Sequence, residues 1–210
     1  MNIPRHKVFI SYYHKDDQLY KNKLINMQYY DTENACYKSI FEDCSVREND
    51  IDDVGLSSEQ IRRIIRDDYI KDATVLIVLF GANTKKRKHI DWEIHAAMYD
   101  NEVNRQMGII VINLPYIRQH ISATNNDERQ LLADNAYWSH ITERTKLEEA
   151  FRYMPSRILD NMEKDVPITV VNWDRIADDK MRLMKLIDNA FSRRLSCEYD
   201  HSAPLRRQNS

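Results

Sequence analysis

Hydrophobic positions in this chain form short continuous runs separated by helically spaced stripes. Continuous runs rich in β-branched residues occupy 74–80 and 108–113. Such runs are typical of strands buried on both faces, as in a parallel sheet. Weaker runs predict three further strands, at 7–12, 39–43 and 166–171.

Apolar stripes of helical period predict helices between these strands. Ser57 with Gln60 three residues later has the form of a capping box, which predicts a helix start there. The segment after Gly81 places Ile90, Ile94, Ala97 and Met98 on one helical face. Other helices are predicted over 14–27, over 143–154 and over the last stripe, 183–191.

Strands that alternate with helices predict an α/β fold with a parallel sheet covered on both faces. Because crossovers are right-handed, the simplest topology is a flavodoxin-like, doubly wound sheet of about five strands. The polar segment 116–163 breaks the rhythm, and we interpret it as a helical and irregular insertion before the last strand. We predict one domain over 1–195 and a disordered tail over 196–210, which has no hydrophobic periodicity.

Composition excludes several classes of partner. Lys and Arg total 31 against 33 Asp and Glu, so no charge excess calls for a nucleic acid or an acidic membrane surface. Three cysteines without a CxxC pair, a polar N-terminus and no apolar run near the ~20 residues of a membrane span predict a cytoplasmic protein. The three glycines, at 55, 81 and 108, form neither a P-loop nor a GxGxxG turn.

Glu93 is the strongest candidate for chemistry. It lies at the edge of the apolar stripe in the helix that follows the strand 74–80. Open α/β sheets hold ligands beside the carboxyl ends of their strands, which is where this carboxylate is predicted to lie. The alternative is that Glu93 only complements the helix dipole, which would contribute about 0.3–1 kcal/mol.

Three segments resemble the Toll/interleukin-1 receptor (TIR) superfamily, and in particular the TIR-like branch that supplies the NAD-processing protein of bacterial Thoeris antiphage systems. They are Val8 to Asp17, Phe41 to Val46, and Val75 to Ile94, which includes Trp92-Glu93-Ile94. The similarity covers roughly residues 5–115 well. Arg47-Glu48-Asn49-Asp50 stands where receptor TIR domains carry Arg-Asp-x-x-Pro-Gly, which argues against receptor-type adaptor signalling.

This resemblance implies a TIR-like fold and an enzyme that cleaves the bond between nicotinamide and ribose in NAD. NAD would be the substrate, and no further cofactor or metal is implied. An ADP-ribose-derived product would diffuse to a separate effector protein, and a phage-derived trigger would raise the activity. The resemblance is also compatible with a homo-oligomer.

The resemblance also implies site residues. Glu93 would be catalytic, and the edge formed by Phe9, Ser11 and Tyr12 would contact the nicotinamide ribose and ring. The alternatives are that Phe9 belongs to the core and that Ser11 caps the next helix.

Two further residues are candidates for substrate binding. Trp92 would stack on a base, or else pack on a neighbouring loop. Asp43 would bind ribose, or else order the loop 45–55.

A single carboxylate is sufficient for this reaction. Ordinary glycosidases use two, one of which protonates a poor leaving group. Nicotinamide departs from NAD as a neutral molecule, so the enzyme needs mainly to stabilise an oxocarbenium-like ribose. Preorganised charge typically contributes a few kcal/mol to such a step.

Other functions are less well supported. His89 and Glu93 are four residues apart, but no third metal ligand accompanies them, and no nucleophile elbow marks a hydrolase. A phospho-receiver would need an acidic pair where Ser11-Tyr12 stands. A TIR-like scaffold without catalysis remains the main alternative.

Overall fold

The computed structural model describes residues 4–45, 60, 63–101, 105–117, 119–132 and 141–209 of the 210-residue chain. The predicted cap at Ser57, the segment Arg47-Glu48-Asn49-Asp50 and most of the loop 45–55 lie outside these residues.

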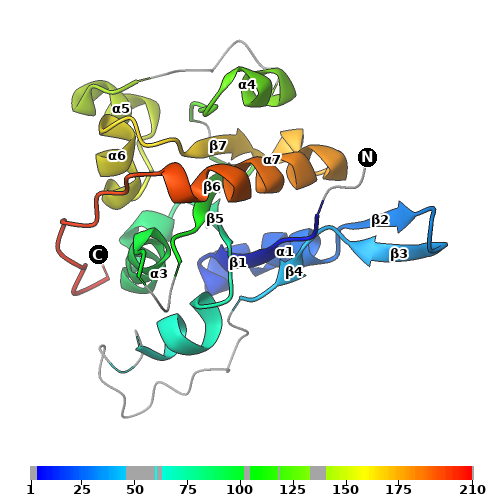
Figure 1. Ribbon diagram of the computed structural model, residues 1–210. Coiled ribbons are helices and arrows are strands. Elements are labelled where there is room, and N and C mark those ends of the chain that lie inside the picture. The colour runs from blue at the N-terminus through cyan, green and yellow to red at the C-terminus, as the bar shows by residue number, and fades with distance from the viewer. Residues whose placement is uncertain are drawn as a thin grey trace.

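Five parallel strands form one sheet in the order β4-β1-β5-β6-β7 (Figure 1). All residues of the two central strands β5 and β6 are buried, which explains their continuous apolar runs. The flavodoxin-like sheet predicted from the sequence is confirmed. The strands are β1 (Lys7–Ser11), β4 (Glu42–Asp43), β5 (Val75–Phe80), β6 (Gly108–Asn113) and β7 (Thr169–Asn172).

Helices cover both faces of the sheet. Successive residues of β5 pack into different hydrophobic cores: Val75 lies on one side of the sheet and Leu76 on the other. The core containing Val75 is closed by α1 (His14–Ile25), α4 (Asn126–Leu132) and α7 (Lys180–Arg193). The opposite core is closed by the π-helical segment η1 (Ile65–Ile70), α3 (Lys88–Met98), α5 (Arg144–Ala150) and α6 (Ser156–Glu163).

Gly108 allows α7 to approach the sheet closely. A Cβ atom at this position would lie 2.1 Å from the backbone oxygen of Ala190 in α7. The start of β6 therefore requires a residue without a side chain.

A two-stranded hairpin follows α1 and was not predicted from the sequence. Its strands β2 (Gln28–Asp31) and β3 (Cys36–Ser39) are antiparallel and separate from the main sheet (Figure 1). Asp31 forms the turn by accepting hydrogen bonds from the backbone N–H groups of Glu33 and Asn34. The strand predicted at 39–43 is correspondingly shortened to β4.

The segment 116–163 is part of the domain's packing. Its second half forms α5 and α6, and the buried residues Leu147 in α5, Phe151 just after it and Ile158 in α6 complete the core beside α3. These helices provide the crossover from β6 to β7. The segment also contains α4 and one antiparallel bridge, Ser122 with Val170.

The predicted disorder of the C-terminal tail is not what the structure shows. After the short 3-10 turn η4 (Arg194–Ser196), Cys197 and Tyr199 are buried, and the Tyr199 hydroxyl donates to the Met107 carbonyl at 2.9 Å. Side chains from distant helices satisfy the tail's backbone groups, so order here does not require a periodic sequence.

Two further 3-10 turns connect the larger elements, η2 (Thr84–Lys86) after β5 and η3 (Trp173–Arg175) after β7. None of the helices in the described part of the chain combines the length and apolar character needed to cross a bilayer.

Candidate active site

A hydrogen bond joins β1 to α3 at the carboxyl edge of the sheet. The Ser11 hydroxyl donates to Oε2 of Glu93 at 2.6 Å. Ser11 is the last residue of β1 and is buried, while Glu93 is partly exposed and is the sixth residue of α3. The structure therefore brings together two of the residues selected from the sequence.

The environment of Glu93 favours the neutral form of its carboxyl group. Burial raises the pKa of this carboxyl to about 7, and the hydrogen bond from Ser11 opposes the rise. A carboxyl whose pKa lies near the working pH is a common feature of functional sites.

The alternative explanation for Glu93 fits poorly. The helix dipole acts on charges within the first turn, but Glu93 lies in the second turn of α3. A group placed only to complement the dipole would also not show a pKa raised by burial.

Phe9 lies on the same face of β1 as Ser11, two residues earlier. It is 1% exposed and belongs to the core beneath α3. Phe9 is therefore a core residue, which is the alternative role considered for it from the sequence. Ser11 does not cap α1, because the N-cap residue of that helix is Tyr13.

Tyr12 points to the opposite face of the sheet. It belongs to the core beside α1, its hydroxyl donates to Gln18 at 2.7 Å, and its ring stacks on His14. The structure does not bring Tyr12 to Glu93, because consecutive strand residues alternate in direction.

The Asp43 carboxylate is engaged by two neighbouring side chains. Oδ2 lies 2.9 Å from Nζ of the buried Lys21, and Oδ1 accepts hydrogen bonds from the backbone N–H and hydroxyl of Ser45. The Ser45 hydroxyl oxygen in turn accepts from the Ile10 N–H. Through these contacts Asp43 anchors the start of the loop 45–55, which is the alternative role considered for it from the sequence. A hydrogen bond from Asp43 to ribose stays a prediction.

Trp92 packs against the C-terminal tail. Its indole N–H donates to the Arg206 carbonyl at 2.9 Å, and its ring meets His89 edge-on. With 5% of its surface exposed, Trp92 is mainly a packing residue of α3.

Sequence reasoning missed the ion pair that anchors the first turn of α3. The buried Arg157 in α6 approaches both Asp91 oxygens, at 3.0 and 3.3 Å, and also donates to the tail carbonyls of Ala203 and Pro204. Asp91 additionally accepts the Arg206 N–H. The partners are dozens of residues apart, and no local pattern signals their pairing.

A buried carboxyl at the same edge of the sheet was also missed. Asp17 in α1 accepts a hydrogen bond from the Tyr116 hydroxyl, and both groups border Gly81 at the end of β5. Burial raises the pKa of Asp17, and the bond from Tyr116 opposes this effect. A Cβ at Gly81 would lie 2.6 Å from the Tyr116 oxygen, so this contact depends on the glycine.

The parallel sheet, its strand order and the helix that carries Glu93 define a TIR-like α/β domain. The model of the family described as the TIR-like domain of Thoeris protein ThsB matches residues 9–119, which include every candidate site residue. The chain therefore belongs to this family and is a TIR-like protein of antiphage defence. A comparison with curated proteins finds no match.

Proposed function

We propose that this protein cleaves the bond between nicotinamide and ribose in NAD, with Glu93 as the catalytic residue. The observation that carries the proposal is the Ser11–Glu93 pair at the carboxyl edge of the sheet. The family match supports the same assignment, because it spans both residues.

In this reaction the C–N glycosidic bond breaks and its electron pair leaves with the ring nitrogen. That pair neutralises the pyridinium, so nicotinamide needs no proton to depart. The positive charge moves to the ribose, where the Glu93 carboxylate stabilises the oxocarbenium-like transition state. Water, or a nucleophile within the ADP-ribose moiety, then adds to the ribose carbon and releases a proton.

The raised pKa of Glu93 suits this role. A carboxylate that is poorly solvated gains from a neighbouring cation, and both the pyridinium of NAD and the oxocarbenium are cations. Bound substrate would therefore favour the ionised form. The Ser11 hydroxyl would orient the carboxylate and hold it on the side of α3 that faces β1.

The product would be an ADP-ribose-derived signalling nucleotide that activates a separate effector. Formation of a cyclic product requires that water be excluded while an internal nucleophile attacks. Activity would remain low until infection supplies the trigger.

The second candidate function is a scaffold that binds partners without catalysis. It is favoured by the β2–β3 hairpin, where Tyr30 and Tyr37 are 50% and 69% exposed. The centroids of their rings are 5.3 Å apart, and the hairpin lies outside the main sheet. An exposed aromatic pair on a hairpin is a suitable contact surface for a protein partner.

To test the proposal, purified protein at high concentration is incubated with NAD, and nicotinamide and nucleotide products are measured by mass spectrometry. Glu93→Gln preserves size and removes the charge; Glu149→Gln makes the same change at an exposed position of α5 and serves as the control. We expect cleavage by the wild type and by the control, and none by Glu93→Gln.

Equal cleavage by all three proteins would exclude Glu93 as the catalyst. If the purified proteins are all inactive, the assay is repeated in lysates of phage-infected cells that express each form. Inactivity of the wild type there as well would favour the scaffold.

A further inference from the structure

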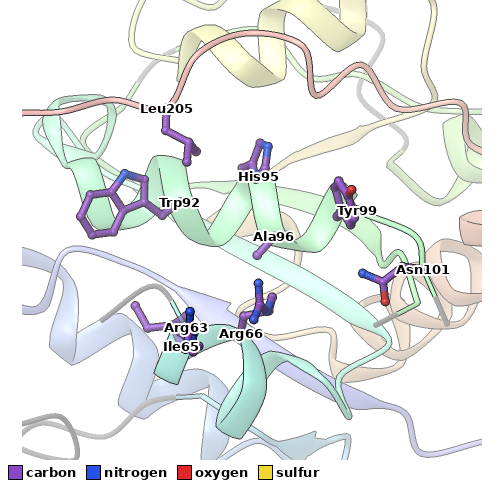
Figure 2. A pocket seen from close by; sticks show the side chains of 9 residues that line it. All are labelled: Arg63, Ile65, Arg66, Trp92, His95, Ala96, Tyr99, Asn101 and Leu205. Atoms are coloured by element: carbon purple, nitrogen blue, oxygen red, sulfur yellow. The ribbon is translucent and has the colours of Figure 1, made fainter. Parts of the chain in front are cut away.

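A cavity of about 450 Å³ lies between α3 and the helical segment that contains η1 (Figure 2). Its residues come from three parts of the chain: the η1 segment, α3 with the residues that follow it, and the C-terminal tail. They are Arg63, Ile65, Arg66, Trp92, His95, Ala96, Tyr99, Asn101 and Leu205.

The charged groups of this cavity are basic. Among the described residues that line it, Arg63 and Arg66 carry positive charge, His95 can gain one, and there is no carboxylate. Arg66 uses Nε and Nη2 to contact the neighbouring Asp67, at 2.6 and 3.1 Å, so Nη1 lies outside that pair. This arrangement favours an anionic ligand, because guanidinium groups bind phosphate through charge-assisted hydrogen bonds.

The α3 side of the cavity offers an aromatic surface. Trp92 and Ala96 are four residues apart on one face of α3, and Tyr99 is the first residue after the helix. Figure 2 shows the Ala96 side chain directed toward Arg66. Tyr99 is 43% exposed, and its ring lies beside those of His95 and His201, with centroids 6.2 and 5.1 Å away. The exposed part of the ring is available to a planar ligand.

We propose that this cavity binds a phosphorylated nucleoside, with its phosphates on Arg63 and Arg66 and its base against Tyr99. Stacking on an aromatic side chain suits any nucleobase, and the volume lies within the usual range of small-molecule sites. Glu93 is not among the described residues that line the cavity, and its carboxylate is bonded to Ser11 on β1. The cavity is therefore distinct from the Ser11–Glu93 pair, although Trp92 lies beside both.

The test titrates ADP into the full-length Glu93→Gln protein by isothermal calorimetry, so that no turnover interferes. In this background, a double change of Arg63→Gln and Arg66→Gln weakens ADP binding about tenfold or more, since it removes two charged contacts. Arg129→Gln makes the same chemical change on α4, against the opposite core, and leaves the affinity unchanged.

Two further probes separate the phosphate and base contacts. Inorganic pyrophosphate binds more weakly than ADP and loses affinity in the double arginine variant. Tyr99→Ala removes the advantage of ADP over pyrophosphate. Thermal melting of each variant establishes that it is folded, which the exposure of Arg63, Arg66 and Tyr99 favours.

The proposal would be overturned if millimolar ADP gave no heat of binding. So would equal affinity of the double arginine variant and the Arg129→Gln control. Adenosine binding as tightly as ADP would overturn the phosphate assignment. None of these outcomes depends on whether the wild type cleaves NAD.

Discussion

The Ser11 hydroxyl and the Glu93 carboxylate, 82 residues apart in sequence, are joined by a hydrogen bond of 2.6 Å. This bond favours the ionised form of Glu93, and burial favours the neutral form more strongly. The balance between them holds the pKa of Glu93 near neutral pH, where the proposed reaction needs a carboxylate.

Ser11→Ala should shift the pH dependence of NAD cleavage. The wild-type kcat/KM is expected to rise with pH through a midpoint near 7, as Glu93 loses its proton. Without the Ser11 bond the pKa of Glu93 rises further, so activity at pH 7 falls several-fold and partly recovers at pH 8.5. Initial rates between pH 5.5 and 9 measure this shift, and an unchanged midpoint would contradict the role of Ser11.

Glu93→Gln should stabilise the protein at high pH. The pKa of Glu93 is raised on folding, so its contribution to stability is greatest below pH 4.5 and is lost as pH rises through 7. Removing the charge should therefore raise the free energy of unfolding by about 1–3 kcal/mol at pH 8, and by little at pH 4.5. Urea unfolding of both proteins at each pH tests this sign. A variant less stable than the wild type at pH 8 would argue against a poorly solvated carboxylate.

Breaking the ion pair between Arg157 and Asp91 should be costly. Arg157→Met leaves Asp91 with a largely buried, uncompensated charge, and we expect a loss of about 3–5 kcal/mol in unfolding free energy. The double variant with Asp91→Leu should recover part of that loss, because both charges are then removed. A double-mutant cycle from urea unfolding measures the coupling, and additive effects would mean that the two residues act independently.

Removal of the tail beyond Glu198 should lower Tm by several degrees. The truncation deletes the buried Tyr199, the backbone partners of Arg157 and the carbonyl that accepts the Trp92 N–H. Hydrogen exchange should increase in α3, which loses its cover. Deleting Ser210 alone is the control. An unchanged Tm after the longer truncation would mean that the tail contributes little to stability, as expected of a disordered segment.

Much of the architecture could be read from periodicity. The runs at 74–80 and 108–113 became β5 and β6, and the stripe of Ile90 and Ile94 became the buried side of α3. Such patterns are reliable because they record which side of an element faces the core, a property set by neighbouring residues. The same patterns located Glu93 at the carboxyl edge of the sheet.

Local patterns failed where long-range contacts decided the outcome. The tail has no periodicity and is ordered by distant partners such as Arg157 and Met107. The β2–β3 hairpin was missed because its strands are short and largely exposed, and so leave no clear apolar alternation.

The amino-acid order alone was enough to establish the α/β class, the positions of the central strands and the place of Glu93 on the helix after β5. Only the folded structure separated Ser11, which reaches Glu93, from Tyr12, which packs on the other side of the sheet. It also showed that Asp43 is held by Lys21 and Ser45. The reason is physical: burial is encoded in short windows of sequence, whereas partners tens of residues apart meet only when the sheet and its helices have assembled.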